Sequence, residues 1–283
     1  MSHEANEPIE KKPGAPAIAF EGVTCSFETP EGVYIATKNS TFSIGDGEFV
    51  SVVGPTGCGK STLLNAAAGL LKPTAGRVLI YGTELKGINR RAGYMFQAES
   101  LMPWATALDN VVMSLKFRGV SESEYLEAGR EWLARVGLER FADRYPHELS
   151  GGMRKRVAMA QTMIADPDIL LMDESFSALD IQTRQLMENE LLDLWQAKKK
   201  AVLFITHDLD EAIAMSDRVV VMSAGPASHP IGSFPISIPR PRNVAEIRVR
   251  PDFNECHAAI WEVLREEVLK SYRDHRSHIS AAG

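Results

Sequence analysis

The stretch Gly54-Pro55-Thr56-Gly57-Cys58-Gly59-Lys60-Ser61-Thr62 decides the fold of this chain. It follows an apolar run, residues 48–53, whose valine content is typical of a buried strand. It precedes residues 63–70, which favour a helix that ends near Gly69. A strand, a glycine-rich loop and a helix in this order form the context of the phosphate-loop motif. A plain glycine-rich turn with an exposed lysine is the alternative, and the match at every fixed position disfavours it.

The residue types in this loop suit the binding of a triphosphate. Glycines let consecutive backbone N–H groups turn toward one point and bind anionic oxygens, and the start of the following helix adds partial positive charge. Lys60 would supply a cation for the β- and γ-phosphates, and Ser61 would supply a hydroxyl for Mg²⁺. The sequence therefore predicts a nucleoside triphosphate site, although the loop does not indicate what the binding drives.

Composition and charge narrow the class of protein and its partners. The net charge of −6 gives no electrostatic reason to bind nucleic acid, so we expect no such partner. Three cysteines, Cys25, Cys58 and Cys256, make no disulfide framework, which suits a reducing cytoplasm. No run reaches the roughly 18 apolar residues of a membrane span, and the polar N-terminus lacks the apolar core of a signal peptide. A partner would have to bring the protein to a membrane.

The pattern along the chain predicts three kinds of structure. The front part contains antiparallel β structure, and the alternation of strands and helices over residues 165–222 indicates a doubly wound α/β core. A helical pattern over residues 108–164 interrupts that alternation, as an inserted subdomain would. We expect a disordered N-terminus at residues 1–16 and one large domain at 17–245, with a helical subdomain at 97–164 inside it. A C-terminal helix and tail would follow at 246–283.

Two acidic residues end a predicted buried strand. Residues 169–172 are all apolar, and Asp173 and Glu174 follow them directly. Placing two carboxylates there is costly unless they are used. We expect Asp173 to hold Mg²⁺ and Glu174 to polarise the water that attacks the γ-phosphate. An acidic turn after a strand is common by itself, but the phosphate loop upstream makes that alternative improbable.

A second anion site is predicted where Ser150-Gly151-Gly152 opens a helix. A serine N-cap followed by glycines is the ordinary alternative. A phosphate-binding protein needs no second anion site unless two chains share the nucleotide. The sequence therefore favours a homodimer in which this helix start of one chain closes on the γ-phosphate held by the other.

With these motifs in view, the sequence resembles the ATP-binding subunit of an ABC transporter over about residues 17–245. The motifs occur in that family's order: Walker A at 54–62, the Q-loop at Gln97, the signature at 149–153, Walker B at Asp173 with the catalytic glutamate at Glu174, the D-loop at 177–180, and the switch histidine at His207.

The resemblance implies a P-loop NTPase (RecA-like) core with an antiparallel β subdomain and an inserted α-helical subdomain. It implies that Phe27 stacks on adenine and that Gln97 senses Mg²⁺ and faces a membrane partner. It makes Glu174, His207 and Gln97 the catalytic residues, with Ser61, Gln97 and Asp173 around the metal. A lone histidine after a strand is more often structural, so the assignment of His207 as the switch histidine depends on the other motifs.

The resemblance further implies an ATPase that powers import. Two copies would bind ATP and Mg²⁺, dock on membrane-spanning permease subunits, and work with a periplasmic or extracellular solute-binding protein. The chain would lie peripherally on the cytoplasmic face of the cell membrane. Residues 97–110 would form the coupling surface. Met102 and Trp104 are apolar residues of a predicted loop there; they could belong to the core, but an exposed apolar patch would mark the membrane partner.

Two positions depart from the family's pattern. Met153 replaces the glutamine of the signature, which we expect to affect signalling more than binding, because Ser150 and the backbone N–H groups remain. Ser175 stands where importers usually carry proline, and we expect no loss of activity. A finer resemblance, carried by residues 97–104, 145–148 and 238–242, is to importers of nitrate, sulfonates and taurine.

Three rival functions are less consistent with the sequence. A soluble ABC-type ATPase without a membrane partner, acting on ribosomes or DNA, usually has two such domains or a long coiled-coil insertion. A small-molecule kinase would need neither the Ser-Gly-Gly stretch nor His207. A non-catalytic subunit would not need Lys60, Asp173 and Glu174 together.

Overall fold

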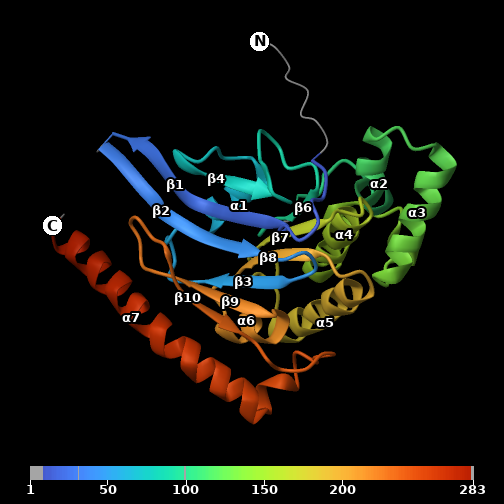
Figure 1. The fold of residues 1–283 in the computed structure, drawn as a ribbon. Helices are drawn as coiled ribbons and strands as arrows, with labels where there is room; N and C mark the ends of the chain where they lie inside the picture. The colour runs from blue at the N-terminus through green and yellow to red at the C-terminus, as the bar shows by residue number, and fades with distance from the viewer. Residues whose placement is uncertain (1–8, 31, 99, 282–283) are drawn as a thin grey trace.

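The computed structural model describes residues 9–30, 32–98 and 100–281. A mixed sheet forms the centre of the molecule, with helices on both of its faces and a smaller antiparallel sheet above it (Figure 1). The central sheet has the order β10-β9-β3-β8-β7-β6. Its strands are β3 (Phe49–Val53), β6 (Ala92–Met95), β7 (Ile169–Asp173), β8 (Ala201–Ile205), β9 (Arg218–Met222) and β10 (Pro230–Pro235).

Strands β6, β7, β8, β3 and β9 are parallel, and β10 pairs antiparallel with β9 at one edge. The parallel strands are buried on both faces, which is why they are almost wholly apolar. In β7, Leu170 and Met172 pack on one side of the sheet, whereas Ile169 and Leu171 pack on the other. Five parallel strands connected through helices confirm the predicted α/β core.

The second sheet is antiparallel, as the sequence predicts, and has the order β2-β1-β4-β5. Its strands are β1 (Ile18–Thr29), β2 (Gly32–Ile44), β4 (Ala75–Ile80) and β5 (Thr83–Glu84). Helix α1 (Lys60–Ala68) contacts both sheets. It ends at Gly69, where φ is 73° and a Cβ would lie 1.8 Å from the Gly87 carbonyl oxygen, so only glycine fits.

Three helices between β6 and β7 form the helical part at the right of Figure 1. They are α2 (Ala107–Phe117), α3 (Glu122–Arg135) and α4 (Gly151–Met163), with 3₁₀ turns at Glu139–Phe141 and Pro146–Glu148. Gly129 of α3 lets α2 approach closely, because a Cβ there would lie 2.3 Å from a Val112 methyl group. The insertion that the interrupted strand pattern predicts is therefore helical.

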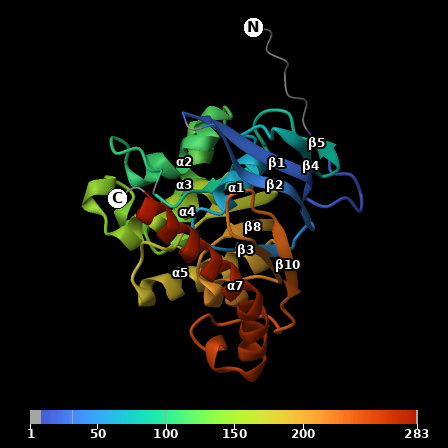
Figure 2. The ribbon, with the colours of Figure 1, turned by 90° about the vertical axis from the view of Figure 1, so that its left-hand side faces the viewer.

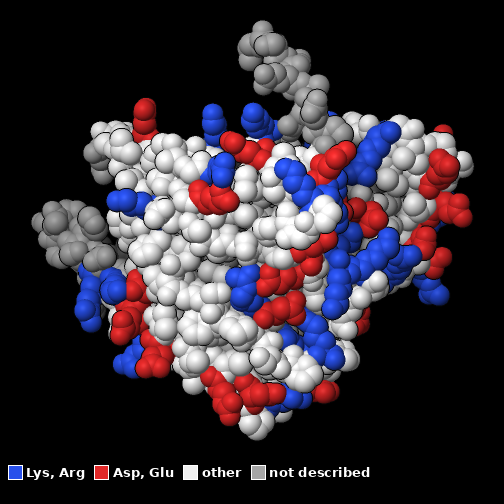
Figure 3. Space-filling model, viewed as in Figure 1, with Lys and Arg blue, Asp and Glu red and all other residues white. Residues whose placement is uncertain are grey.

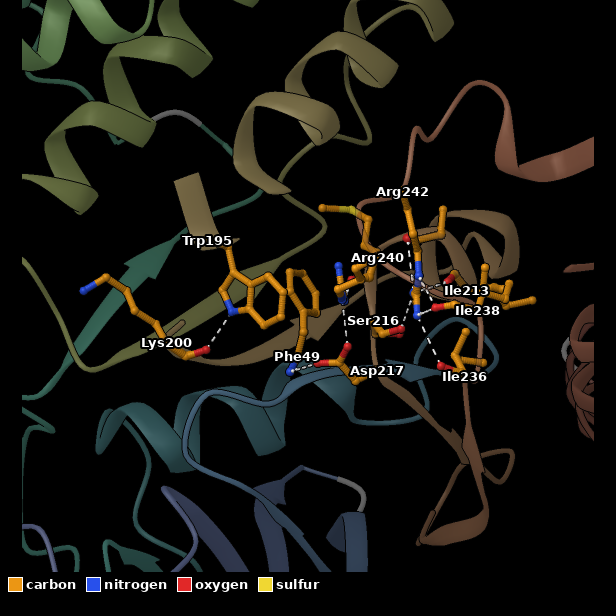
Figure 4. Close-up of polar contacts among 12 residues, drawn as sticks. Phe49, Trp195, Lys200, Ile213, Ser216, Asp217, Ile236, Ile238, Arg240 and Arg242 are labelled. Atoms are coloured by element: carbon orange, nitrogen blue, oxygen red, sulfur yellow. Dashed lines mark hydrogen bonds and ion pairs between the residues drawn. The ribbon is translucent and has the colours of Figure 1, made fainter. Parts of the chain in front are cut away.

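Helices α5 (Ile181–Ala197) and α6 (Leu209–Met215) cover the face of the central sheet opposite α1. Figure 4 shows how the proline- and arginine-rich segment after β10 is held on this side. Arg242 is buried and donates to carbonyl oxygens of Ser216 and Ile238 at 2.6 and 2.8 Å. Burial lowers the pKa of Arg242 to about 10. Arg240 stacks over the Trp195 ring at 4.3 Å, so the motif at 238–242 anchors the segment.

Helix α7 (Pro251–Ala281) follows a short 3₁₀ turn at Ile247–Val249 and runs along the molecule (Figure 2). Phe253, Ile260 and Leu264 bury its inner side, as their helical spacing predicts. The helix continues to Ala281, so it extends into the end of the chain, where the sequence predicts a tail. None of the described helices, α7 included, is both long enough and apolar enough to cross a bilayer.

The N-terminal segment is only partly described. Residues 1–8, part of the predicted disordered region 1–16, lie outside the described residues. Residues 9–16 form no helix or strand, yet they contact the body of the protein. The Lys11 amine lies 2.9 Å from an Asp168 carboxylate oxygen, and Arg91 donates to the Ile9 carbonyl at 2.5 Å. In the view of Figure 3, charges of both signs surround a broad uncharged area over β2 and β10.

Candidate nucleotide site

The phosphate loop connects β3 to α1, the order that the sequence predicts. Gly59 has φ 88° at the start of α1, and a Cβ there would lie 2.6 Å from a methyl group of Thr37. The loop therefore needs glycine for both its backbone conformation and its packing. The Lys60 side chain is 6% exposed, and its amine donates to the carbonyls of Gly54 and Pro55 at 2.9 and 3.0 Å. The loop and its lysine thus form one compact unit at the end of β3.

Ser61 and Asp173 meet beside this loop. The Ser61 hydroxyl donates to Asp173 Oδ1 at 2.9 Å, although the two residues are 112 positions apart. Burial raises the pKa of Asp173; the Ser61 hydrogen bond opposes that shift and the charge of Glu174 adds to it. A hydroxyl and a carboxylate are oxygen donors of the kind that Mg²⁺ uses beside substrate phosphates, so this pair fits a magnesium ion.

Glu174 contacts the two other candidate catalytic residues, Gln97 and His207. Its Oε2 atom accepts a hydrogen bond from Gln97 Nε2 at 3.3 Å and lies 3.2 Å from His207 Nδ1. Gln97 follows β6, Glu174 follows β7 and His207 follows β8. The carboxyl ends of neighbouring parallel strands lie at one edge of a sheet, which is where open α/β sheets bind ligands. The structure therefore brings the three predicted catalytic side chains together.

The backbone at Glu174 is unusual and tightly held. Its φ of 41° lies in the left-handed region, which costs a non-glycine residue on the order of 1–3 kcal/mol. The Glu174 N–H donates to Ile205 O at 2.9 Å, and its carbonyl accepts from the Ser177 hydroxyl at 2.9 Å. The buried Ser175 hydroxyl donates to Met95 O at 3.1 Å, a contact that proline in its place could not make. Ser175 therefore ties the turn to β6.

The signature residues make their described contacts with α4 and with Thr183 of α5. Ser150 is the N-cap of α4, and its hydroxyl accepts from Met153 N at 3.3 Å. Gly151 and Gly152 form the first turn of this 13-residue helix. Within the described residues, no hydrogen bond or ion pair joins Ser150, Gly151 or Gly152 to the loop 54–62. Met153 is partly buried against the core.

An aromatic pair stands beside the phosphate loop. Phe27 of β1 lies directly opposite Tyr34 of β2, so both side chains project from one face of this hairpin. Both are partly exposed, at 39% and 42%. A carbon added at Gly225 would lie 3.3 Å from the Gly57 carbonyl and 3.9 Å from the Tyr34 hydroxyl, which places Tyr34 near the loop. Sequence reasoning selects Phe27 and misses Tyr34, although the aromatic residue next to the hairpin turn was a visible signal.

Arg184 is a second residue that sequence reasoning misses. It lies in the first turns of α5, and its guanidinium donates to the carbonyls of Ser177 and Leu179 at 3.3 and 3.1 Å. The same group lies 3.6 Å from an Asp208 carboxylate oxygen, next to His207. Arg184 therefore fixes the segment after Glu174 relative to the segment after β8. Nothing in the local sequence indicates this contact.

Comparisons with known proteins agree with this fold and site. The sequence profile of the ABC transporter family matches residues 37–177. An uncharacterised ABC transporter ATP-binding protein of Methanocaldococcus jannaschii is 45% identical over 256 residues, which is 90% of this chain and 94% of the relative. The taurine import ATP-binding protein of Pseudomonas aeruginosa is 39% identical over 249 residues, covering 87% of this chain and 94% of that protein.

Two further similarities concern nitrate import and structure. The nitrate import ATP-binding protein of a Synechocystis species is 41% identical over 244 residues, covering 84% of this chain and 91% of that protein. A solved ATP-binding cassette, a dimer in a post-hydrolysis state with ADP and phosphate bound, superposes with a TM-score of 0.70 at 33% identity. That similarity covers 78% of this chain and 99% of the cassette.

The fold and its phosphate loop define a P-loop ATPase of the ATP-binding cassette class. The chain belongs to the ABC transporter family, among its ATP-binding subunits. It binds and hydrolyses ATP, and the expectation of an ABC ATPase fold is confirmed. Proteins of this family act with membrane permease subunits and dimerise.

Proposed function

We propose that this chain is the ATP-hydrolysing subunit of an importer for a small anionic or zwitterionic solute such as nitrate, a sulfonate or taurine. The observation that carries the substrate class is the identity of about two residues in five with the taurine and nitrate import subunits over nearly their whole length. The domain division into residues 17–245 and 246–283 remains part of this proposal.

In the proposed site, the phosphate loop and Lys60 bind the triphosphate. The amine that now donates to Gly54 and Pro55 sits at the centre of the loop, where it can turn to the β- and γ-phosphates. Ser61 and Asp173 would hold Mg²⁺, which when bound neutralises charge on the phosphates. Phe27 and Tyr34 would contact the adenine ring.

Glu174 would act as the base for the attacking water. Its carboxylate is positioned by Gln97 and His207, and the constrained backbone fixes where its oxygens point. The Gln97 side-chain nitrogen bonds that carboxylate, which leaves the side-chain oxygen as the atom that would face the metal. A side chain that would contact both the catalytic carboxylate and the metal suits a residue that senses the state of the nucleotide.

The proposed assembly is a homodimer docked on permease subunits, with a solute-binding protein that delivers the substrate. Ser150, Gly151 and Gly152 would complete the partner's site, since they are separated from the loop of their own chain. Trp104 lies 76% exposed in the segment between β6 and α2, which supports that segment as the docking surface for the permease. The chain would then lie peripherally at the cytoplasmic face of the membrane.

Solute uptake by the organism that encodes this chain tests the proposal. Cells that lack the gene should lose ATP-dependent uptake of labelled nitrate, taurine or an alkanesulfonate, and the wild-type gene should restore it. The Lys60→Ala gene should fail to do so. Unchanged uptake of all three solutes would refute the substrate class. A chain that hydrolyses ATP but never co-purifies with a membrane protein would instead support the soluble ABC-type ATPase.

A further inference from the structure

A buried lysine connects the helix that begins at the signature to the segment that carries Gln97. Lys155 lies in α4, five residues after Ser150, and is only 2% exposed. Its amine donates to the carbonyl oxygens of Gln97 and Phe96 at 2.5 and 3.3 Å. The two pairs of residues are separated by 58 and 59 positions in the sequence.

A buried ammonium group is expensive unless acceptors surround it. Here the acceptors include backbone carbonyls of residues that follow β6, where strand pairing has ended. Hydrogen bonds from a charged donor are shorter and stronger than neutral ones. The amine therefore stabilises one conformation of the segment at 96–97 and holds that segment against α4, which also packs on β6.

The connection continues from Lys155 to the proposed catalytic base. Lys155 holds the backbone of Gln97, and the Gln97 side chain donates to Glu174 at 3.3 Å. At the other end, α4 begins at Ser150, which is N-cap of the same helix. The signature helix is thus joined to Gln97 by a side-chain contact and not only by packing.

We propose that Lys155 is a positioning residue that couples the signature helix to Gln97 and, through Gln97, to Glu174. The inference rests on the proposed roles of Gln97 and Glu174. Closure of the signature on the partner's nucleotide and placement of Gln97 beside Glu174 then occur together. Lys155 is almost fully buried, and in this proposal it acts on hydrolysis only through the position of Gln97.

Substitution of Lys155 by methionine tests this role, because methionine keeps an unbranched chain and removes the donor. Losing a group that orients a site residue typically reduces activity by roughly 10–100-fold. We expect kcat of the purified protein to fall by about tenfold. The KM for ATP should change little, since the phosphate loop and Lys60 are untouched. Lys155→Gln, which keeps an N–H donor, should give an intermediate kcat.

Lys200 provides a matched control. It is 8% exposed, and its amine donates to the Pro167 carbonyl at 2.6 Å, away from the proposed catalytic residues. Lys200→Met removes a comparable bond between a nearly buried lysine and a backbone carbonyl, together with the 2.7 Å ion pair that the same amine forms with Asp166. We expect it to lower the melting temperature and to leave kcat of the folded protein at the wild-type level. Lys155→Met should differ from it in kcat.

A double-mutant cycle with Gln97→Ala separates positioning from a general structural effect. If Lys155 acts through the Gln97 side chain, adding Lys155→Met to Gln97→Ala should reduce kcat no further. Equal losses of kcat with and without the Gln97 side chain would overturn the proposal, as would a wild-type kcat for Lys155→Met. If the methionine variant does not fold, Lys155→Gln enters the same cycle. Wild-type activity of Glu174→Gln would instead overturn the proposed site.

Discussion

The Ser61 hydroxyl donates a hydrogen bond to Asp173 Oδ1 at 2.9 Å and so joins the start of α1 to the end of β7. This hydrogen bond does not fully offset the free-energy cost of burying the Asp173 carboxylate at the end of β7. Burial raises the pKa of its carboxyl group, and the neighbouring Glu174 raises it further. The aspartate is therefore a source of instability without nucleotide and a ligand for Mg²⁺ in the proposed site.

Asp173→Asn should stabilise the nucleotide-free protein at pH 7. A carboxyl group whose folded pKa is raised contributes stability at low pH and loses it as the pH rises through that pKa. Asparagine removes the charge and keeps an oxygen for Ser61, so the variant should melt at a higher temperature. The difference should shrink as the pH falls toward the range in which Asp173 is protonated. Calorimetry without nucleotide measures both effects.

Asp109→Asn is the control, for which we expect the opposite change in melting temperature at pH 7. A hydrogen bond from Lys116 lowers the pKa of Asp109, so its charge adds stability above its unfolded pKa, and the variant should melt lower at pH 7. With ATP and Mg²⁺ added, wild type should gain more thermal stability than Asp173→Asn. An Asp173→Asn protein less stable than wild type at pH 7 would contradict this interpretation of the site.

Phe27 and Tyr34 should both contribute to ATP affinity through the base. Stacking of a base on an aromatic side chain is worth about 1–3 kcal/mol, so Tyr34→Ala and Phe27→Ala should each raise the Kd for ATP by roughly 5–150-fold. Val33→Ala, at the neighbouring exposed position of β2, is the control and should change the Kd little. Calorimetric titration measures each constant.

Inorganic tripolyphosphate separates stacking from general damage to the loop. Its affinity should be unchanged in Tyr34→Ala and Phe27→Ala, because it has no base. Equal losses of ATP and tripolyphosphate affinity would mean that the aromatic pair supports the phosphate loop and does not contact adenine.

Glu174→Gln should bind ATP and fail to hydrolyse it. The substitution keeps size and polarity but removes the base, which typically costs about 10²–10⁴ in rate. ATP should then accumulate on a stable dimer that light scattering detects. Glu262→Gln, on the exposed side of α7, should hydrolyse ATP at the wild-type rate and stay without that dimer. Rapid hydrolysis by Glu174→Gln would remove Glu174 from its proposed role.

The parts of the site that a short stretch specifies could be predicted from the sequence. The phosphate loop needs its glycines and Lys60 within a few consecutive positions, and the two acids at the end of β7, Asp173 and Glu174, follow an apolar run. The order of strands and helices follows from the same local periodicity. These features depend on neighbours in the chain, so the pattern itself contains the information.

The parts that depend on distant contacts could not be predicted. The hairpin register places Tyr34 opposite Phe27, and the Lys155 amine reaches the Gln97 carbonyl because α4 packs beside β6. Strand β10 also went unpredicted, since proline at 230 and 235 argues against a strand and is tolerated at a sheet edge.

In the proposed assembly two copies of the chain share each nucleotide, and mixing two inactive variants tests this sharing. Lys60→Ala should not bind ATP usefully, and Ser150→Arg should bind ATP but block the facing γ-phosphate. Their heterodimer keeps one intact site, made from the phosphate loop of the Ser150→Arg chain and the signature of the Lys60→Ala chain. We predict that ATPase activity returns on mixing, below the wild-type level. No activity at any mixing ratio, while heterodimers demonstrably form, would contradict the shared site.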